Sequence, residues 1–156
     1  MSDLMVTRIE TLEELADALE IRRRVFIDEQ QVPEDEEIDR FDNDPTTVDD
    51  CLHLLVRLDG EPIATGRLLL DEPAGERAHI GRIAVLLEHR GTGAGRVVME
   101  ALQDEARRLG RPGITLSAQL HAMPFYERLG YRARGDVFLD AGIEHRWMDL
   151  DFDAAS

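Results

Sequence analysis

The sequence contains no lysine, one cysteine and few aromatic residues, which make up 5% of its 156 residues. A single cysteine, Cys51, forms neither an internal disulfide nor a cysteine-based zinc site, so we interpret it as a packing residue and expect no metal. No apolar run approaches the roughly 18 residues of a membrane helix, so no membrane partner is expected. The N-terminal residues lack the basic and apolar regions of a signal peptide, which favours a cytoplasmic protein.

Basic side chains are also scarce. Thirty-three acidic side chains stand against 18 basic ones, all arginine, and the formal net charge is −15. Nucleic-acid binding needs a basic face against the phosphates, so no nucleic-acid partner is expected. GC-rich genomes favour arginine codons, which explains the missing lysine but not the charge. An acidic surface suits a very salty cytoplasm, and we therefore favour a halophilic source.

The length fits one domain over residues 1–156, with an ordered core over about 5–150 and a frayed tail from Phe152. Apolar patterns predict seven strands and three helices, the last of them short. The strands are 5–9, 52–58, 62–70, 79–87, 114–118, 131–138 and 143–150, and the helices are 12–27, 95–109 and 122–129. This order predicts an α/β (α+β) protein, a mixed sheet with helices packed on it.

Local signals support these boundaries. Thr11 stands three residues before Glu14, a capping box, and Asp59-Gly60 predicts a tight hairpin. Gly110 is the expected stop of the second long helix. Helical spacing of apolar residues predicts the inward face of each long helix. The predicted inward residues are Leu12, Leu15, Ala16, Leu19 and Phe26 in the first helix, and Val98, Ala101, Leu102, Ala106 and Leu109 in the second.

Residues 28–50 differ in kind from the rest of the chain. They carry eleven acidic side chains and one base, Arg40, and Pro33 and Pro45 interrupt them. A helix is not expected to persist through this segment, although short helical turns fit it. We expect chiefly a solvated surface, with an amine-attracting rim of a site as the alternative.

One loop combines three glycines with two arginines between a strand and a helix: Arg90-Gly91-Thr92-Gly93-Ala94-Gly95-Arg96. Glycines without side chains before a helix N-terminus leave backbone N–H groups free for a phosphate or pyrophosphate. A Walker A loop needs a lysine, and the dinucleotide fingerprint needs a third glycine at the position of Arg96. Both are therefore excluded, which argues against a nucleotide-binding regulator.

The spacing Arg-x-x-Gly-x-Gly resembles the phosphate loop of the GNAT (Gcn5-related) N-acetyltransferases. A second stretch, Gln119 to Tyr131, resembles that family's Asn-x-x-Ala-x-x-Phe-Tyr-x-x-x-Gly-Phe/Tyr, with glutamine in the asparagine place. Val25 to Gln30 and Phe138 to His145 resemble the ElaA/YjcF-like branch. The resemblance covers about residues 5–150. It implies a mostly antiparallel sheet of six to seven strands, about four helices and splayed central strands.

The resemblance also implies acetyl-CoA in a V-shaped opening between residues 83–85 and 114–118. The residues that it assigns to the cofactor come from four elements. They are Ile83, Ala84 and Val85, then Arg90, Gly91, Thr92, Gly93, Ala94, Gly95 and Arg96, and finally Gln119 and Phe125. The backbone at 83–85 would pair with the pantetheine arm, and the loop amides would take the pyrophosphate.

For the chemistry, the resemblance places Tyr126 as the acid that protonates the departing thiolate. The alternative is a tyrosine at the core edge with its hydroxyl bonded to backbone. The base is less defined: His79 has the strand parity of Ile83 and Val85, and three further candidates remain open. Those candidates are His145, Glu29 and His121, and the acceptor side is expected at Glu29, Gln30 and His145.

Two functions are compatible with these features. The first is transfer of an acetyl group to an amine of a small molecule or a protein. The second is a non-catalytic acyl-CoA-binding module on the same fold. A monomer and a homodimer are equally compatible with the sequence.

Overall fold

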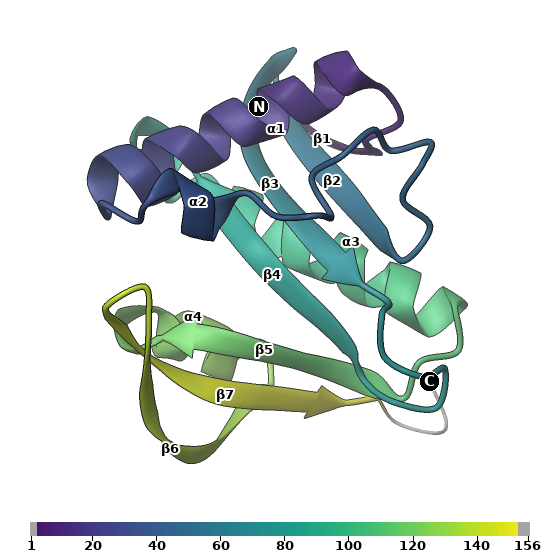
Figure 1. The fold of residues 1–156 in the computed structure, drawn as a ribbon, viewed down its shortest axis with the longest axis vertical. Coiled ribbons are helices and arrows are strands. Elements are labelled where there is room, and N and C mark those ends of the chain that lie inside the picture. Colours follow the sequence, from purple (N-terminus) through teal and green to yellow (C-terminus); the bar gives the residue numbers. More distant parts are fainter. Residues whose placement is uncertain (1–2, 153–156) are drawn as a thin grey trace.

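The computed structural model describes residues 3–152 (Figure 1). Its seven strands are β1 (Leu4–Arg8), β2 (Cys51–Leu58), β3 (Glu61–Leu69), β4 (Ala78–Val85), β5 (Gly113–Gln119), β6 (Arg132–Asp140) and β7 (Ile143–Asp151). Its α-helices are α1 (Leu12–Arg22), α2 (Glu34–Glu37), α3 (Ala94–Arg108) and α4 (Met123–Arg128). A π-helix, η1 (Arg23–Glu29), continues α1, and the 3₁₀ turns η2 (Leu87–His89) and η3 (Leu120–Ala122) precede α3 and α4.

The strands form one sheet in the order β1-β2-β3-β4-β5-β7-β6. Every neighbouring pair is antiparallel except β4 and β5, which run parallel. These two strands pair only at Ala78 with Ile114 and at His79 with Thr115, and then diverge (Figure 1). The predicted α/β (α+β) sheet with splayed central strands is therefore confirmed.

The helices cover opposite faces of the sheet. In Figure 1, α1 crosses in front of the upper strands and α3 lies behind them. The α1 side buries Leu15, Ile21 and Val25 against Leu55. The α3 side holds the larger core, to which α4 contributes the half-buried Phe125 and Tyr126. Alternate residues of β2 and β4 therefore face two different cores, and side-chain parity decides which side of the sheet a residue faces.

The predicted start of the first helix is confirmed, and so are Leu15, Leu19 and Phe26 of its predicted inner face, but Leu12 and Ala16 are not. The backbone N–H of Glu14 donates to the Thr11 hydroxyl at 3.1 Å, as the capping box requires. Leu12 is 56% exposed and Ala16 is also exposed, so both predictions of inward side chains were wrong. The buried stripe runs instead through Leu15 and Ala18 at helical spacing, which turns Ala16 outward.

Other local predictions have mixed outcomes. Asp59 and Gly60 both have positive φ, as the predicted two-residue hairpin needs. Leu109 is 43% exposed rather than inward, because α3 ends at Arg108. Phe152 is not frayed: its N–H donates to Pro112 O at 2.9 Å and Arg107 lies over its ring. The rest of the predicted tail, 153–156, lies outside the described residues.

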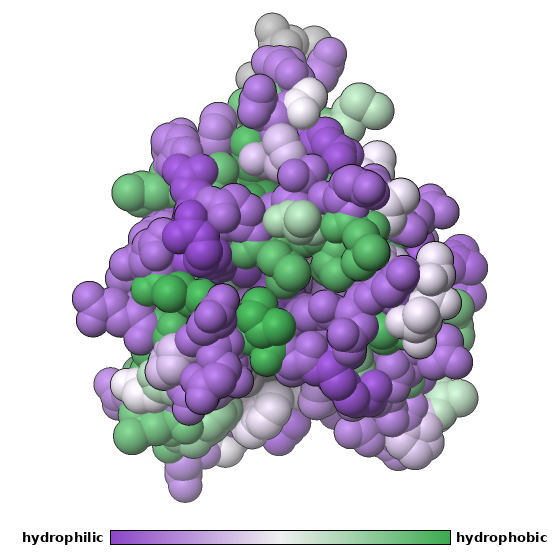
Figure 2. Space-filling model, turned by 45° about the horizontal axis from the view of Figure 1, so that its top comes forward, coloured by the Kyte–Doolittle hydropathy of each residue, from purple (hydrophilic) through white to green (hydrophobic). Residues whose placement is uncertain are grey.

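The surface is as hydrophilic as the composition indicates. On the face shown in Figure 2, hydrophobic side chains form small patches within a predominantly hydrophilic surface. Among residues 3–152, no helix is long and apolar enough to cross a membrane.

Candidate active site

A cleft of about 690 Å³ opens where β4 and β5 separate. Its walls come from η1, the start of the acidic segment, β4, the glycine loop, β5, α4 and the β6–β7 hairpin. Most residues singled out from the sequence line it: Gln30, Ile83, Ala84, Val85, Arg90, Gly91, Gly93, Ala94, Gly95, Arg96, Gln119, His121, Phe125, Tyr126 and His145. Thr92, Glu29 and His79 are not among the lining residues. The topology thus brings segments over a hundred residues apart to one cleft.

The glycine loop presents unpaired backbone donors to this cleft. Gly91 and Gly93 both have φ of 90°, a conformation that glycine adopts without strain. Within residues 3–152, the N–H groups of Gly91, Gly93, Gly95 and Arg96 have no hydrogen-bond partner. Thr92 stabilises the loop from outside, donating its hydroxyl to His89 O at 2.7 Å and accepting from Ala94 N at 3.3 Å. Free N–H groups at the start of the 15-residue helix α3 are the kind of donors that an anion can accept from.

The two arginines of the loop already have carboxylate partners. Arg90 donates to both oxygens of Glu29, at 3.0 and 2.9 Å, and its Nε donates to Val85 O at 3.1 Å. Arg96 Nε donates to Glu100 at 3.1 Å on the exposed side of α3. Glu29, expected at the acceptor side, is thus paired with the loop. The guanidinium of Arg90 is thus fully engaged, that of Arg96 is engaged through Nε, and the backbone N–H groups are the loop's other free donors within the described residues.

A bulge in β4 overturns the parity argument for His79. The β3–β4 register shifts between Thr65 and Arg67 because β4 has one extra residue there. That residue is Arg82, whose φ is 53°. Before the bulge, Ala78 and Ile80 face the α3 core; after it, Ile83 and Val85 do. His79 therefore faces the opposite side from Ile83 and Val85. Its ring lies 6.0 Å from the ring of Trp147.

Tyr126 reaches the cleft from the α3 face. Its ring packs edge-on against Phe125 at 5.1 Å, and Phe125 in turn lies against the backbone of Gly95. Within the described residues the Tyr126 hydroxyl has no hydrogen-bond partner. Its oxygen is not among the buried polar atoms that lack a partner, so it is accessible to solvent in the cleft. Burial raises the pKa of Tyr126 to about 12, which keeps the phenol protonated. The alternative interpretation, a hydroxyl tied to backbone, does not hold.

Two polar residues bridge the cleft from the α1 face. Gln119 Nε2, at the end of β5, donates to Gln30 Oε1 at 2.7 Å, just after η1. In β7, His145 lies directly opposite Gln119 and is 8% exposed. Its Nδ1 lies 2.7 Å from Ile143 O. Gln30, Gln119 and His145 therefore meet at one level of the opening.

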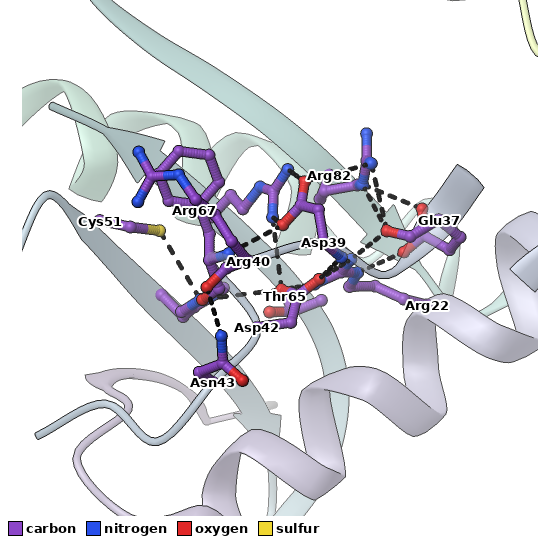
Figure 3. Close-up of polar contacts among 12 residues, drawn as sticks. Arg22, Glu37, Asp39, Arg40, Asp42, Asn43, Cys51, Thr65, Arg67 and Arg82 are labelled. Atoms are coloured by element: carbon purple, nitrogen blue, oxygen red, sulfur yellow. Dashed lines mark hydrogen bonds and ion pairs between the residues drawn. The ribbon is translucent and has the colours of Figure 1, made fainter. Parts of the chain in front are cut away.

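Three carboxylates of the acidic segment form an ion-pair cluster with arginines (Figure 3): Glu37, Asp39 and Asp42 pair with Arg22, Arg67 and Arg82. Most of the other acidic residues of the segment are exposed, in line with the expected solvated surface. Arg22 Nε donates to Glu37 at 2.6 Å, and its terminal nitrogens donate to both oxygens of Asp42 at 2.7 and 3.0 Å. Arg67 donates to Asp39 at 2.7 and 2.6 Å. The expectation of a solvated surface was wrong for Glu37 and Asp42, whose side chains are 3% and 0% exposed.

This cluster builds one wall of the cleft. The Arg82 side chain, from the β4 bulge, reaches Glu37 Oε1 at 3.0 Å and the Glu36 and Glu37 carbonyls. Burial raises the pKa of the Glu37 carboxyl, and Arg22 and Arg82 oppose that rise. Burial also acts to raise the pKa of Asp39, but the hydrogen bonds and charge of Arg67, the Phe41 N–H and the charge of Arg82 together outweigh it and lower that pKa to about 2. The carboxylates therefore serve as internal partners of arginines.

Cys51 lies beside this cluster and is buried, in line with a packing role. Burial raises the pKa of its thiol to about 12. Such a thiol stays protonated and is a poor nucleophile. Among the described residues, no group of histidine, cysteine and acidic side chains is arranged to hold a metal ion.

The sequence indicates residues 28–50 only as the alternative rim of a site, and it does not single out Glu36, Glu37 or Arg82 as lining residues. No local signal marks them, because Arg82 and Glu37 are 45 positions apart and meet only through the fold. Runs of acids are usually solvated, and nothing in the spacing of 34–39 distinguishes a buried carboxylate. The one available hint was that Arg22 falls on the buried stripe of α1.

A splayed parallel pair of strands, a glycine loop with free N–H groups and an α4 tyrosine occur together in the described part of this chain. The family profile described as the Acetyltransferase (GNAT) family matches residues 11–131. The chain belongs to the GNAT acetyltransferase family. The order of the motifs in the sequence and the observed topology therefore point to the same family.

Relatives agree with this assignment. The chain is 41% identical over 141 residues to a Bacillus subtilis protein described as the uncharacterized N-acetyltransferase YjcF, covering 89% of this chain and 94% of the relative. An acyl-CoA N-acyltransferase structure from Pseudomonas aeruginosa is 35% identical with a TM-score of 0.79, covering 94% of this chain and 99% of that one. Escherichia coli ElaA matches in fold, with a TM-score of 0.82 at 24% identity over 96% of this GNAT chain and 100% of its own. The predicted ElaA/YjcF-like branch is confirmed.

Proposed function

We propose that this GNAT protein transfers the acetyl group of acetyl-CoA directly to an amine in a ternary complex. The observation that carries the proposal is the cleft itself, which has free amides at one end and the unpaired Tyr126 hydroxyl inside. The pyrophosphate would accept from the N–H groups of Gly91, Gly93, Gly95 and Arg96. This arrangement lets a protein of net charge −15 bind a polyanion through local backbone dipoles.

The rest of the cofactor would follow β4. Beyond His79 this strand has no pairing with β5, so the backbone at Ile83, Ala84 and Val85 is available to the pantetheine arm. An N–H near the bulge would hold the thioester oxygen as it gains charge in the transition state. Phe125 and Gln119 lie where they would contact the arm. Thr92 acts on the loop from outside.

Tyr126 would protonate the departing thiolate. Its raised pKa of about 12 leaves a neutral phenol at pH 7, which is the form that a proton donor needs. The acceptor would enter from the α1 face, between η1, the acidic wall and the β6–β7 hairpin. We expect the protein to act in the cytoplasm, where acetyl-CoA is available, as a monomer or a homodimer.

The experiment that tests this proposal measures free thiol released from acetyl-CoA in the presence of a panel of amines. Suitable members are phenethylamine, spermidine, glucosamine and a tripeptide with a free N-terminus. Amine-dependent release, with the acetylated product seen by mass spectrometry, is the expected result. Tight coenzyme A binding with no release for any amine would favour the non-catalytic acyl-CoA-binding module.

A further inference from the structure

We propose that His145 is the general base that takes the proton from the attacking amine. The inference rests on the proposed acetyl transfer and names a residue whose role in it the sequence left open. Four observations carry it: the fixed tautomer of the ring, its open nitrogen, its level in the cleft and the face of the sheet that it occupies.

The backbone fixes the tautomer of His145. Its Nδ1 lies 2.7 Å from the carbonyl oxygen of Ile143, and a carbonyl carries no hydrogen to donate. In the neutral ring Nδ1 therefore carries the proton, and Nε2 has the lone pair. Phe138 stacks on the ring at 5.9 Å and 25°, which holds its orientation.

The basic nitrogen is open to the cleft. In the part of the chain that the structure describes, Nε2 has no hydrogen-bond partner, and it is not among the buried polar atoms left unpaired. His145 is 8% exposed and lines the cleft, so the exposed atom faces cleft solvent. A protonated Nδ1 with an accessible Nε2 is the arrangement that a general base requires.

His145 also stands at the level where the reaction would occur. The last paired residues of the splayed strands are His79 and Thr115. Four residues farther along β4 is Ile83, next to the bulge, and four farther along β5 is Gln119. Because Gln119 pairs with His145, the histidine lies across the opening from the bulge. The bulge is the place where a backbone N–H would donate to the thioester carbonyl.

Base and acid would approach from opposite faces of the sheet. Leu116 and Met148 are paired across β5 and β7 and face the α3 core, together with Tyr126. Side chains alternate along a strand, so His145, three positions before Met148, faces the α1 side. The thiolate would thus leave toward Tyr126 while the amine arrives beside His145. The two proton transfers are spatially separated.

The other candidate bases have weaker settings. Glu29 is bidentate to Arg90, and both oxygens of Glu37 already contact guanidinium groups. His79 lies outside the cleft lining. His121 lines the cleft from the exposed turn η3, with no described group that fixes its ring. His145 is the candidate whose ring is both oriented and open.

The proposed step balances as follows. The neutral amine nitrogen bonds to the thioester carbon, and the carbon–sulfur bond then breaks. His145 Nε2 takes the proton lost by the nitrogen, and the Tyr126 hydroxyl gives its proton to the thiolate. The products are the amide and coenzyme A thiol. The imidazolium and the phenolate then return to their starting forms by exchanging a proton through cleft water.

The test is H145N, because asparagine keeps an N–H near the position of Nδ1 and has no basic nitrogen. With whichever of phenethylamine, spermidine, glucosamine or the tripeptide the wild type uses best, kcat should fall about 10²- to 10⁴-fold. Calorimetry should show unchanged coenzyme A affinity. E144Q, at the adjacent exposed residue of β7, is the matched control.

A second variant separates catalysis from structure. In H145A, added imidazole should restore part of the lost kcat, which would not occur if the ring only stabilised β7. Wild-type kcat in folded H145N would overturn the assignment. So would a loss in H145A that imidazole does not restore, or a loss found in H79N and not in H145N. Absence of turnover by the wild type would instead refute the proposed function, so the two failures are distinguishable.

Discussion

Two polar regions line the cleft from opposite sides, and they handle charge in opposite ways. The glycine loop keeps four backbone N–H groups unpaired among the described residues, while its arginines are tied to carboxylates. The acidic cluster uses nearly all its donors and acceptors internally; one buried donor, Arg67 Nε, is left unpaired. Unpaired donors on a rigid loop are suited to a ligand, and paired buried charges are suited to a scaffold. The loop should therefore control affinity, and the cluster should control stability.

The largest expected effect comes from breaking the cluster at Arg22. R22M leaves Glu37 and Asp42 buried with fewer partners, and removing one side of a buried ion pair costs about 3–5 kcal/mol. The matched control is R23M, because Arg23 is the next residue and pairs with Glu20 and Asp28 at the exposed surface. Urea unfolding followed by Trp147 fluorescence should show a large loss for R22M and a midpoint near wild type for R23M. Equal losses of stability in R22M and R23M would show that the buried cluster stabilises the fold no more than a surface ion pair does.

The next effect separates chemistry from binding at Tyr126. Y126F removes the unpaired hydroxyl and keeps the ring packed against Phe125. Since water can partly replace a general acid, we expect kcat to fall by about 10²-fold, the low end of the usual range, with coenzyme A affinity nearly unchanged. Steady-state kinetics and calorimetry check the two quantities separately. Full activity in Y126F would assign Tyr126 to packing and place the acid elsewhere.

The smallest effect concerns salt. At −15, mutual repulsion of carboxylates opposes folding, and its range falls from about 30 Å at 0.01 M salt to about 3 Å at 1 M. The melting temperature should therefore rise steeply to a few tenths molar KCl. Salt that is excluded from the protein surface also strengthens the hydrophobic effect. In a halophilic protein this should extend the rise in melting temperature to molar salt concentrations. A scan from 0.05 to 3 M KCl, with NaCl as control, measures it. A plateau above about 0.3 M would discard the halophilic source and leave the acetyltransferase proposal untouched.

The two regions also differ in how well the sequence predicted them. The loop and its neighbours are local signals, since glycine spacing, a preceding strand and a following helix lie within one short stretch. The hairpin at Asp59-Gly60 and the cap at Thr11 were predictable for the same reason. Family resemblance then supplied the splayed strands, which no local pattern encodes.

The remainder depended on contacts between distant residues. The partners of Arg67 in the acidic segment are up to 28 positions away, and only the fold brings them together. The bulge at Arg82 shifted side-chain parity by one, which moved His79 to the other face although its strand was predicted correctly. A one-residue irregularity has no composition signal, yet it decides which residues of β4 share a face of the sheet.

The most direct test of the central claim is coenzyme A binding to variants of Gly93. Because Gly93 has φ of 90°, G93A and G93D share the same backbone strain and differ only in the carboxylate. Calorimetry should show that G93D binds coenzyme A at least about tenfold more weakly than G93A, as expected for losing hydrogen bonds to a charged group. Pantetheine, which lacks the pyrophosphate, should bind both variants alike. Equal coenzyme A affinity in folded G93A and G93D would contradict the assignment of the loop as the pyrophosphate site.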